Sequence, residues 1–201
     1  MTTGLPFDDF RNLIKTLPQP DENARSRAAE RNAKLSAQGP SLGRLGEISE
    51  WLATWTGRDP MVTRPLVSLF AGTYDGIDKS HEKTQAMVEH AAAGGAMICQ
   101  LCAANDLGLK VFDLALHIPV GDISNKAALD ERGCAATMAF GMEAIAGGVD
   151  LICVGGLGVG SSMSAAALMA ALYGGQASEW SEEHAAKIEL ALAHHEGNLK
   201  D

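Results

Sequence analysis

The sequence predicts an α/β protein of the Rossmann-like kind, with a parallel sheet that has helices on both faces and an N-terminal helical subdomain before it. Three apolar stretches of strand length follow residue 64, and stretches with helical character separate them. Strands that alternate with helices of about ten or more residues form βαβ units. We therefore assign residues 1–60 to the helical subdomain and residues 61–201 to a parallel α/β core, together forming one continuous domain.

Three helices are predicted before the sheet, over residues 8–17, 20–36 and 41–57. Acidic residues at the start of the first two favour a helix N-terminus, and Ser41 is a good N-cap for the third. The second helix is polar, which indicates a solvated face or a contact with a partner chain. The third has an apolar face formed by Leu42, Leu45, Ile48, Leu52 and Trp55.

Strands are predicted over residues 65–72, 109–116 and 149–154. Helices are predicted over residues 84–105, 126–147 and 161–173, with a last helix capped by Ser181. Sheets usually have about five or six strands. Three strands therefore indicate an unusually small sheet, or one that a partner or a longer chain completes.

The formal net charge of −9 argues against a nucleic-acid partner and against an anionic membrane surface. The start of the chain does not have the pattern of a signal peptide, and no apolar run reaches the roughly 18 residues that span a bilayer. The four cysteines suggest no disulfide framework, so we expect a cytoplasmic protein.

No metal site and no cofactor are predicted. Cys99 and Cys102 form a C-x-x-C pair inside the predicted helix 84–105, where packing explains them better than redox chemistry. His194 and His195 are adjacent, so they point to different faces of a helix and do not form a two-histidine metal grip.

The stretch Leu151-Ile-Cys-Val-Gly-Gly-Leu-Gly-Val-Gly-Ser-Ser-Met-Ser164 passes from a strand into a helix. Glycines let the backbone approach a ligand closely, and N–H groups in the first turn of a helix attract anions. It is not a Walker loop, because no lysine follows, and not a clean dinucleotide fingerprint. The pattern leaves two interpretations open, a loop that holds a phosphate and a tight corner that needs glycine for steric reasons alone.

Five stretches of the chain are considered together: Pro40-Ser-Leu-Gly-Arg-Leu45, Phe70-Ala-Gly72, Thr84-Gln-Ala-Met-Val88, Ala93-Gly-Gly-Ala-Met-Ile98 and Gly155-x-x-Gly-x-Gly160. In this order and spacing they resemble the nicotinate-nucleotide–dimethylbenzimidazole phosphoribosyltransferase family, of which this chain would be a short, divergent or truncated member.

The resemblance implies a pentosyltransferase that moves phosphoribose from nicotinate mononucleotide to a benzimidazole nitrogen in cobalamin lower-ligand synthesis. It also implies a homodimer, or here a heteromer with a homologous chain. The family's phosphate loop corresponds to Gly155, Gly158, Gly160, Ser161 and Ser162.

The sequence departs from the family at the site. Gly156 stands where the family loop has a glutamate, the loop 73–83 is shorter, and a glycine-rich segment is missing between Trp180 and Lys187. The family's general base lies in a part with no counterpart here, so no catalytic residue is assigned. Candidates for the base pocket are Tyr74, Asp75, His81 and Leu157, although solvated loop side chains are the better explanation of Asp75 and His81.

Two functions therefore stay open. The chain is a phosphoribosyltransferase acting on small-molecule substrates, or a degenerate paralogue that binds a nucleotide or a benzimidazole, or pairs with an active homologue, without turnover. On the phosphate interpretation, Gly160→Val abolishes nucleotide binding and leaves the chain folded.

Overall fold

The structure is a computed structural model that describes residues 7–77 and 81–198. The chain divides into two compact units, Met1–Thr63 and Arg64–Asp201. This division lies close to the domain boundary predicted at residue 60. The expectation about a signal peptide, and part of the loop 73–83, fall on residues 1–6 and 78–80, outside the described residues.

The first unit contains the helices α1 (Asp8–Lys15), α2 (Glu22–Gln38) and α3 (Arg44–Thr56). Asp21 begins α2, because its carboxylate accepts a hydrogen bond from the Ala24 amide at 2.9 Å. The helix α3 ends at Gly57, which adopts the left-handed conformation that glycine favours at this position.

The helices α2 and α3 pack through a small core of Ala24, Ala28 and Ala53. Asn32 strengthens the pairing, since its amide group donates to the Gly46 carbonyl at 3.0 Å and to the Ser49 hydroxyl at 2.9 Å. The predicted apolar face of α3 is only partly buried in this unit, and its two tryptophans are about half exposed.

The second unit contains a parallel sheet in the order β2-β1-β3. Its strands are β1 (Pro65–Ala71), β2 (Gly108–Asp113) and β3 (Leu151–Leu157). The central strand β1 is the most buried, and in the register of the sheet Ser68 lies between Lys110 and Val154. The predicted parallel α/β sheet is confirmed.

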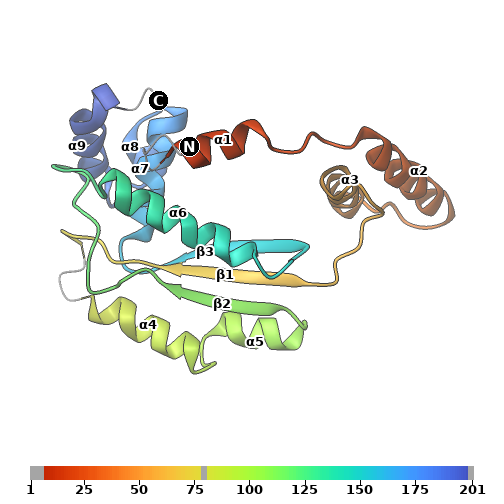
Figure 1. Cartoon of the computed structure of the whole chain (residues 1–201), viewed down its shortest axis with the longest axis horizontal. Coiled ribbons are helices and arrows are strands. Elements are labelled where there is room, and N and C mark those ends of the chain that lie inside the picture. The colour runs from red at the N-terminus through yellow and green to blue at the C-terminus, as the bar shows by residue number, and fades with distance from the viewer. Residues whose placement is uncertain (1–6, 78–80, 199–201) are drawn as a thin grey trace. The chain divides into compact units, whose positions relative to one another are not determined.

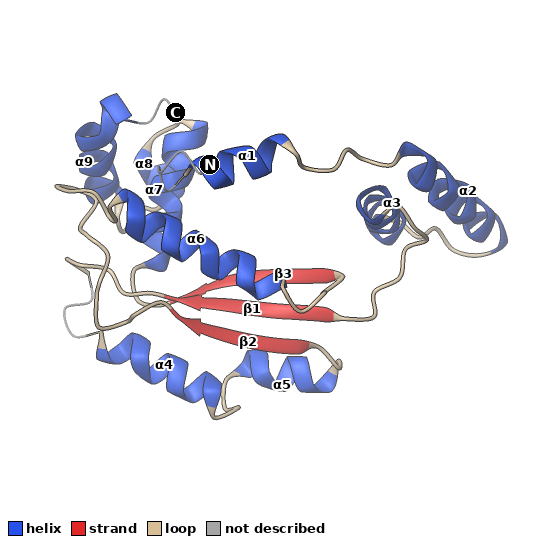
Figure 2. Ribbon diagram, viewed as in Figure 1, coloured by secondary structure: helices blue, strands red, loops and turns tan. Residues whose placement is uncertain are grey.

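Within the described residues, six α-helices accompany this sheet: α4 (Glu82–Ala92), α5 (Met97–Ala104), α6 (Glu131–Ile145), α7 (Ser161–Tyr173), α8 (Ala177–Trp180) and α9 (Ala185–His195). Figure 2 shows α6 on one side of the strands and α4 and α5 on the other. Right-handed crossovers require this arrangement. The connection from β1 to β2 and the connection from β2 past β1 to β3 run in opposite directions along the sheet, so their helices lie on opposite faces. The helices α7, α8 and α9 gather beyond the strand ends (Figure 1).

Several boundaries differ from the prediction, among them the end of the second strand, which lies at Asp113 and not at residue 116. The predicted helix 84–105 is two helices, because the chain turns at Gly94 with φ of 78°. The third strand continues to Leu157, so the first glycines of the corner lie inside it. The helix α6 begins only after Asp130, whose carboxylate accepts from the Gly133 amide at 2.7 Å.

The last predicted helix begins later than expected, and a short helix that the sequence did not predict, α8, precedes it. The helix α8 ends at Trp180, and α9 begins at Ala185, four residues after the predicted cap Ser181. Ser181 still accepts a hydrogen bond from the His184 amide at 3.3 Å. The main apolar core lies between these helices and α7, and consists of Met163, Ala166, Ala167, Ala170, Ala177 and Ile188.

Candidate functional site

The candidate site lies beyond the carboxyl ends of β1 and β3. The helices α4 and α5, which connect β1 to β2, lie on one face of the sheet, and α6, which connects β2 to β3, lies on the other face. Ligands of open α/β sheets bind at such a switch point, outside the carboxyl ends of the strands. The loop after β1 and the glycine corner after β3 therefore meet where this architecture places a ligand.

The glycine corner is packed directly against the loop after β1. Gly158 has φ of 145°, and a Cβ built on it would lie 2.3 Å from the carbonyl oxygen of Gly72. Gly160 has φ of 95°, and a Cβ there would lie 3.1 Å from Ile77 and 3.3 Å from Tyr74. Both positions require glycine for backbone conformation and for close approach of the two loops.

Hydrogen bonds also join the two loops. The Gly72 amide donates to the Leu157 carbonyl at 3.1 Å, and the Val159 amide donates to the Thr84 hydroxyl at 3.1 Å. Thr84 is fully buried, so this bond is protected from water. The corner is therefore held by contacts within the protein as well as by its glycines.

The predicted phosphate residues lie in two places. Gly155 is a strand residue opposite Leu69, whereas Gly158 and Gly160 form the corner itself. Ser161 and Ser162 form the first turn of α7, and the Ser161 amide donates to the Gly158 carbonyl at 3.3 Å. Among the described residues, we find no hydrogen-bond partner for the amides of Ser162 and Met163. Free amides in a first turn are suited to an anion.

The predicted base-pocket residues are only partly together. Tyr74 is half-buried and lies against the glycine corner, and Leu157 ends β3. Burial raises the pKa of the Tyr74 hydroxyl above its ordinary value. His81 begins α4 with φ of 48°, beyond the undescribed residues, and Asp75 points to a lysine instead.

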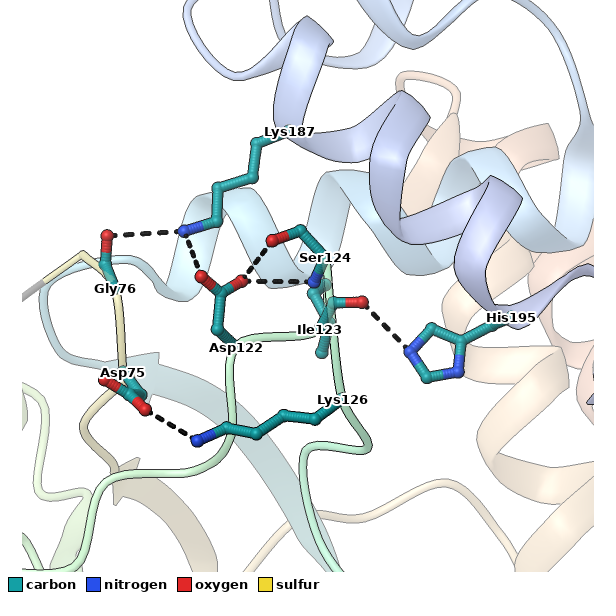
Figure 3. A network of polar contacts seen from close by, with 8 residues as sticks. All are labelled: Asp75, Gly76, Asp122, Ile123, Ser124, Lys126, Lys187 and His195. Carbon is teal, nitrogen blue, oxygen red and sulfur yellow. Dashed lines mark hydrogen bonds and ion pairs between the residues drawn. The ribbon is translucent and has the colours of Figure 1, made fainter.

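Two ion pairs connect the loops after β1 and β2 with α9 (Figure 3). The Nζ of Lys126 lies 2.8 Å from Oδ2 of Asp75. The Nζ of Lys187, in α9, lies 2.9 Å from Oδ2 of Asp122. Lys187 also donates to the Gly76 carbonyl at 3.3 Å. Each lysine is thus matched by an aspartate, so neither adds net positive charge to the site.

The two aspartates differ in burial. The hydrogen bond and the charge of Lys126 hold the pKa of the exposed Asp75 below its ordinary value, and Asp75 raises the pKa of Lys126. Burial acts to raise the pKa of Asp122. Hydrogen bonds from the Ser124 hydroxyl, Lys187 and the Ser124 amide outweigh that effect, so the Asp122 pKa lies below its ordinary value.

The loops after β1 and β2 also pair as backbone. Tyr74 forms a parallel bridge with Val120, and the Asp75 amide donates to the Val120 carbonyl at 2.9 Å. The Thr73 hydroxyl donates to the Leu116 carbonyl at 2.8 Å in a buried position. The two loops therefore behave as a short continuation of the β1–β2 pair.

An apolar cavity of about 280 Å³ lies beside these loops, between α7 and α9. Tyr74, Ile123, Ala167, Ala171 and Ala191 form part of its walls, and His195 stands at its edge. The Nε2 of His195 is 3.0 Å from the Ile123 carbonyl, which can only accept, so Nε2 carries the proton of this bond. The cavity is adjacent to the glycine corner because Tyr74 borders both.

Sequence reasoning did not identify Asp122, Lys126, Lys187 or His195 as neighbours of the site. No local pattern marks them, because each pairs with a group on another loop or helix. The sequence did contain one usable signal: the loop after the second strand lies at the same sheet edge as the loop after the first.

The C-x-x-C pair lies differently from the prediction. Cys99 is in the first turn of α5 and donates to the Ala91 carbonyl at 3.2 Å, because the break at Gly94 starts a new helix. Cys102 is buried, and burial raises the pKa of its thiol. A buried, protonated thiol is a poor nucleophile, so packing remains the better explanation.

Within residues 7–77 and 81–198, no three His, Cys, Asp or Glu side chains come together as a metal-binding group. Across the same residues, no helix has both the length and the apolar character that crossing a membrane requires.

The chain is similar to known phosphoribosyltransferases. A family model described as phosphoribosyltransferase matches residues 17–196. The nicotinate-nucleotide–dimethylbenzimidazole phosphoribosyltransferase of Agrobacterium fabrum is 53% identical over 216 residues, which cover 99% of this chain and 62% of that protein. The Rhizobium etli protein of the same name is 54% identical over 215 residues, with 99% and 64% covered.

A crystal structure of the Thermus thermophilus protein of the same name superposes with a TM-score of 0.71 at 25% identity, over 86% of this chain and 62% of that one. The chain thus spans less than two thirds of the length of these relatives. The alignment with the A. fabrum protein is longer than the 201 residues of this chain, so that relative has extra residues inside the matched region.

Proposed function

Because this chain belongs to the phosphoribosyltransferase family that matches residues 17–196, we propose that it takes part in moving phosphoribose from nicotinate mononucleotide to a benzimidazole nitrogen. The observation that carries this proposal is the 53% identity to an enzyme of that name over almost the whole chain. The motifs of the glycine corner and of the Phe70-Ala-Gly72 exit lie inside the matched region. We also propose that the protein acts in the cytoplasm.

In this proposal the 5′-phosphate binds at the start of α7. The free amides of Ser162 and Met163 and the hydroxyls of Ser161 and Ser162 would bind its oxygens, aided by the helix dipole. The position at the switch point of the sheet supports this assignment. The site then needs no lysine, which agrees with the pairing of Lys126 and Lys187 to aspartates.

The benzimidazole would bind beside Tyr74, where the loop after β1, Leu157 and the adjoining apolar cavity offer an uncharged surface. Asp75 and His81 stay candidates for the rim of this pocket. The two carboxylates described in the loops beside the corner, Asp75 and Asp122, are each paired with a lysine, so no group of this chain is assigned as the base that takes the benzimidazole proton.

A second candidate function is supported by specific observations. Gly156 brings no carboxylate to the ribose, and the relatives carry extra residues inside the matched region. The glycine corner also leaves little space for a ligand, because Gly158 lies against Gly72 and Gly160 lies against Ile77. These features favour a non-catalytic paralogue that binds a nucleotide or a benzimidazole, or that pairs with an active homologue in a heteromer.

Calorimetry and an activity assay separate the two functions. Titrations with nicotinate mononucleotide and with dimethylbenzimidazole measure binding, and chromatography measures nicotinate release when both are present. Binding together with release supports the enzyme, and binding without release supports the paralogue. If neither binding nor release is observed, the enzyme and the ligand-binding paralogue both fail, and only pairing with an active homologue is left.

A serine pair tests the phosphate position. The double substitution S161A/S162A removes two hydroxyl donors, and each charge-assisted hydrogen bond contributes about 1.5–3 kcal/mol. We expect nucleotide affinity to fall at least about tenfold. S178A, at an exposed serine of α8, is the matched control. These variants are cleaner than Gly160→Val, because any side chain at Gly160 meets Ile77 and Tyr74 and also strains the backbone.

A further inference from the structure

We propose that the cavity between α7 and α9 selects which benzimidazole this chain binds. The ring lies with its nitrogen edge toward Tyr74 and its carbocycle toward Ala171, so that alkyl groups on the carbocycle fill the far end of the cavity. The proposal rests on the proposed function, namely that the chain binds a benzimidazole, and it adds the residues that discriminate between such ligands. It assigns no base to the transfer reaction.

The size of the cavity suits two fused rings. Its volume is about 280 Å³, whereas an engineered apolar cavity of about 150 Å³ binds a single benzene ring. Pockets for larger ligands enclose about 300–1,000 Å³. The cavity is therefore large enough for a bicyclic base and small for a complete nucleotide.

The walls of the cavity are short and uncharged. Four of the lining residues are alanines, namely Ala128, Ala167, Ala171 and Ala191. Ala167 and Ala171 are about one turn apart on the same face of α7, and Ala191 belongs to α9. Side chains this short leave room for a flat ring between the two helices. Of the described residues that line the cavity, none is Asp, Glu, Lys or Arg, so a neutral and largely apolar ligand fits best.

The polar groups around the cavity also favour a neutral ligand. Burial raises the pKa of the Tyr74 hydroxyl, which therefore stays protonated at neutral pH. The Nε2 of His195 is engaged with the Ile123 carbonyl at 3.0 Å. The nearby Lys126 and Lys187 are each paired with an aspartate. A ligand in the cavity thus meets no lysine charge that lacks a counterion.

The direction of the ring follows from the position of the glycine corner. A ring nitrogen has to reach the ribose, and the proposed phosphate position places the nucleotide at the start of α7. Tyr74 lines the cavity and also borders the corner, because a Cβ on Gly160 would lie 3.3 Å from the Tyr74 Cβ. Ser164, in the first turns of α7, lines the cavity as well. The nitrogen edge therefore lies toward Tyr74 and Ser164, whose hydroxyl groups suit ring nitrogens.

The end of the cavity away from the corner offers only hydrocarbon along α7. Ala171 lies about 10 Å farther along the helix than Ser164, at about 1.5 Å per residue. Ala167 and Leu168 line the cavity between them. Positions 5 and 6 of a benzimidazole are on the edge opposite the nitrogens, so their substituents reach toward Ala171.

Calorimetry with two ligands tests the proposal. The full 201-residue chain is titrated with benzimidazole and with 5,6-dimethylbenzimidazole. Burial of two methyl groups should make the dimethyl ligand bind about tenfold more tightly. A171L fills the far end, so we expect the dimethyl ligand to lose affinity at least about tenfold and benzimidazole at most about threefold. A171V, a smaller change measured in parallel, should reduce the preference in the same direction.

The matched control is A165L, because Ala165 is exposed on α7 and does not line the cavity. It should keep the wild-type preference. Circular dichroism should show equal helix content in wild type and in the three variants. The affinity for nicotinate mononucleotide should not change in A171L, because the corner is not altered.

The outcomes separate the proposal from the proposed function. If wild type binds both benzimidazoles with equal affinity, or if A171L and A171V keep the wild-type preference, the selection by this cavity is refuted and the proposed function stands. An equal loss of both ligands and of the nucleotide in A171L would show a general structural effect and would refute it too. If wild type binds neither benzimidazole, the proposed function loses its base site, and the selection fails with it.

Discussion

Replacing Gly158 with alanine tests whether the glycine corner is held by close packing. An alanine at φ of 145° lies in a region that L-residues rarely adopt, which costs about 1–3 kcal/mol. Its Cβ would also lie 2.3 Å from the Gly72 carbonyl oxygen, so the two backbones must move apart, at a cost of about 1–3 kcal/mol. We expect G158A to lower the free energy of unfolding by about 2–6 kcal/mol, summed from these two costs.

The matched control is G156A, two residues earlier. Gly156 has no positive φ, and a Cβ there would lie 3.8 Å from the Cβ of Ser161, which is an ordinary contact. An alanine in the interior of a strand is favoured over glycine by up to about 1 kcal/mol. We therefore expect G156A to be neutral or slightly stabilising.

Urea unfolding at 25 °C, followed by far-ultraviolet circular dichroism, measures both variants without any ligand. The midpoint for G158A should shift to lower urea at an unchanged slope, which indicates a change in stability alone. If G158A and G156A unfold within about 0.5 kcal/mol of each other, which is the range of an ordinary surface substitution, close packing is the wrong explanation of the corner.

The remaining predictions concern three buried or half-buried polar groups. S68A should raise the free energy of unfolding by about 1 kcal/mol, because the fully buried Ser68 hydroxyl has no partner within the described residues. T84V should lower it by about 1–3 kcal/mol, because the Val159 amide loses its acceptor, whereas T84S should restore most of the loss. D122N should lower it by about 1–3 kcal/mol at neutral pH, because the charged contact with Lys187 is lost. Urea unfolding measures all three, and a destabilised S68A, a neutral T84V or a neutral D122N would contradict the corresponding argument.

The effect of D122N should depend on pH in a defined direction. The pKa of Asp122 is lower in the folded chain than its ordinary value of 3.8, so its carboxylate stabilises the fold above that value. This contribution is lost as pH falls through the lower, folded pKa. The stability difference between wild type and D122N should therefore be constant near neutral pH and shrink below about pH 4. A difference that grows on acidification would show that the pKa is raised instead.

The sequence predicted the class of fold because its strands and helices alternate strongly. It did not predict the break at Gly94, since the apolar residues on both sides keep a helical spacing across the glycine pair. It also ended the third strand too early, because glycines in Leu151–Leu157 read as a loop although Gly155 pairs opposite Leu69. At Gly94 the local preference of glycine interrupted the helical pattern, whereas at Gly155 pairing with β1 outweighed that preference.

The resemblance found in the ordered motifs is confirmed by the family model and by the relatives. The details of the site were beyond the sequence for a physical reason. Asp122 meets Lys187, and His195 meets the Ile123 carbonyl, only after α9 folds over the loops of the sheet. Such pairs join segments far apart in the chain, and one sequence carries no pattern that matches them. The phosphate and base-pocket assignments stay predictions for the experiments above.

The central position of β1 affects how the protein is made. Leu66 pairs with Gly108 on one side and with Ile152 on the other, so the middle strand is synthesised long before its second neighbour. At about 5–20 residues per second, a ribosome needs on the order of ten seconds to reach the end of β3. During that interval the apolar strand β1 has no strand paired with its second edge. Folding therefore includes a late closure of long loops, and until that closure the unpaired edge of β1 is exposed to aggregation.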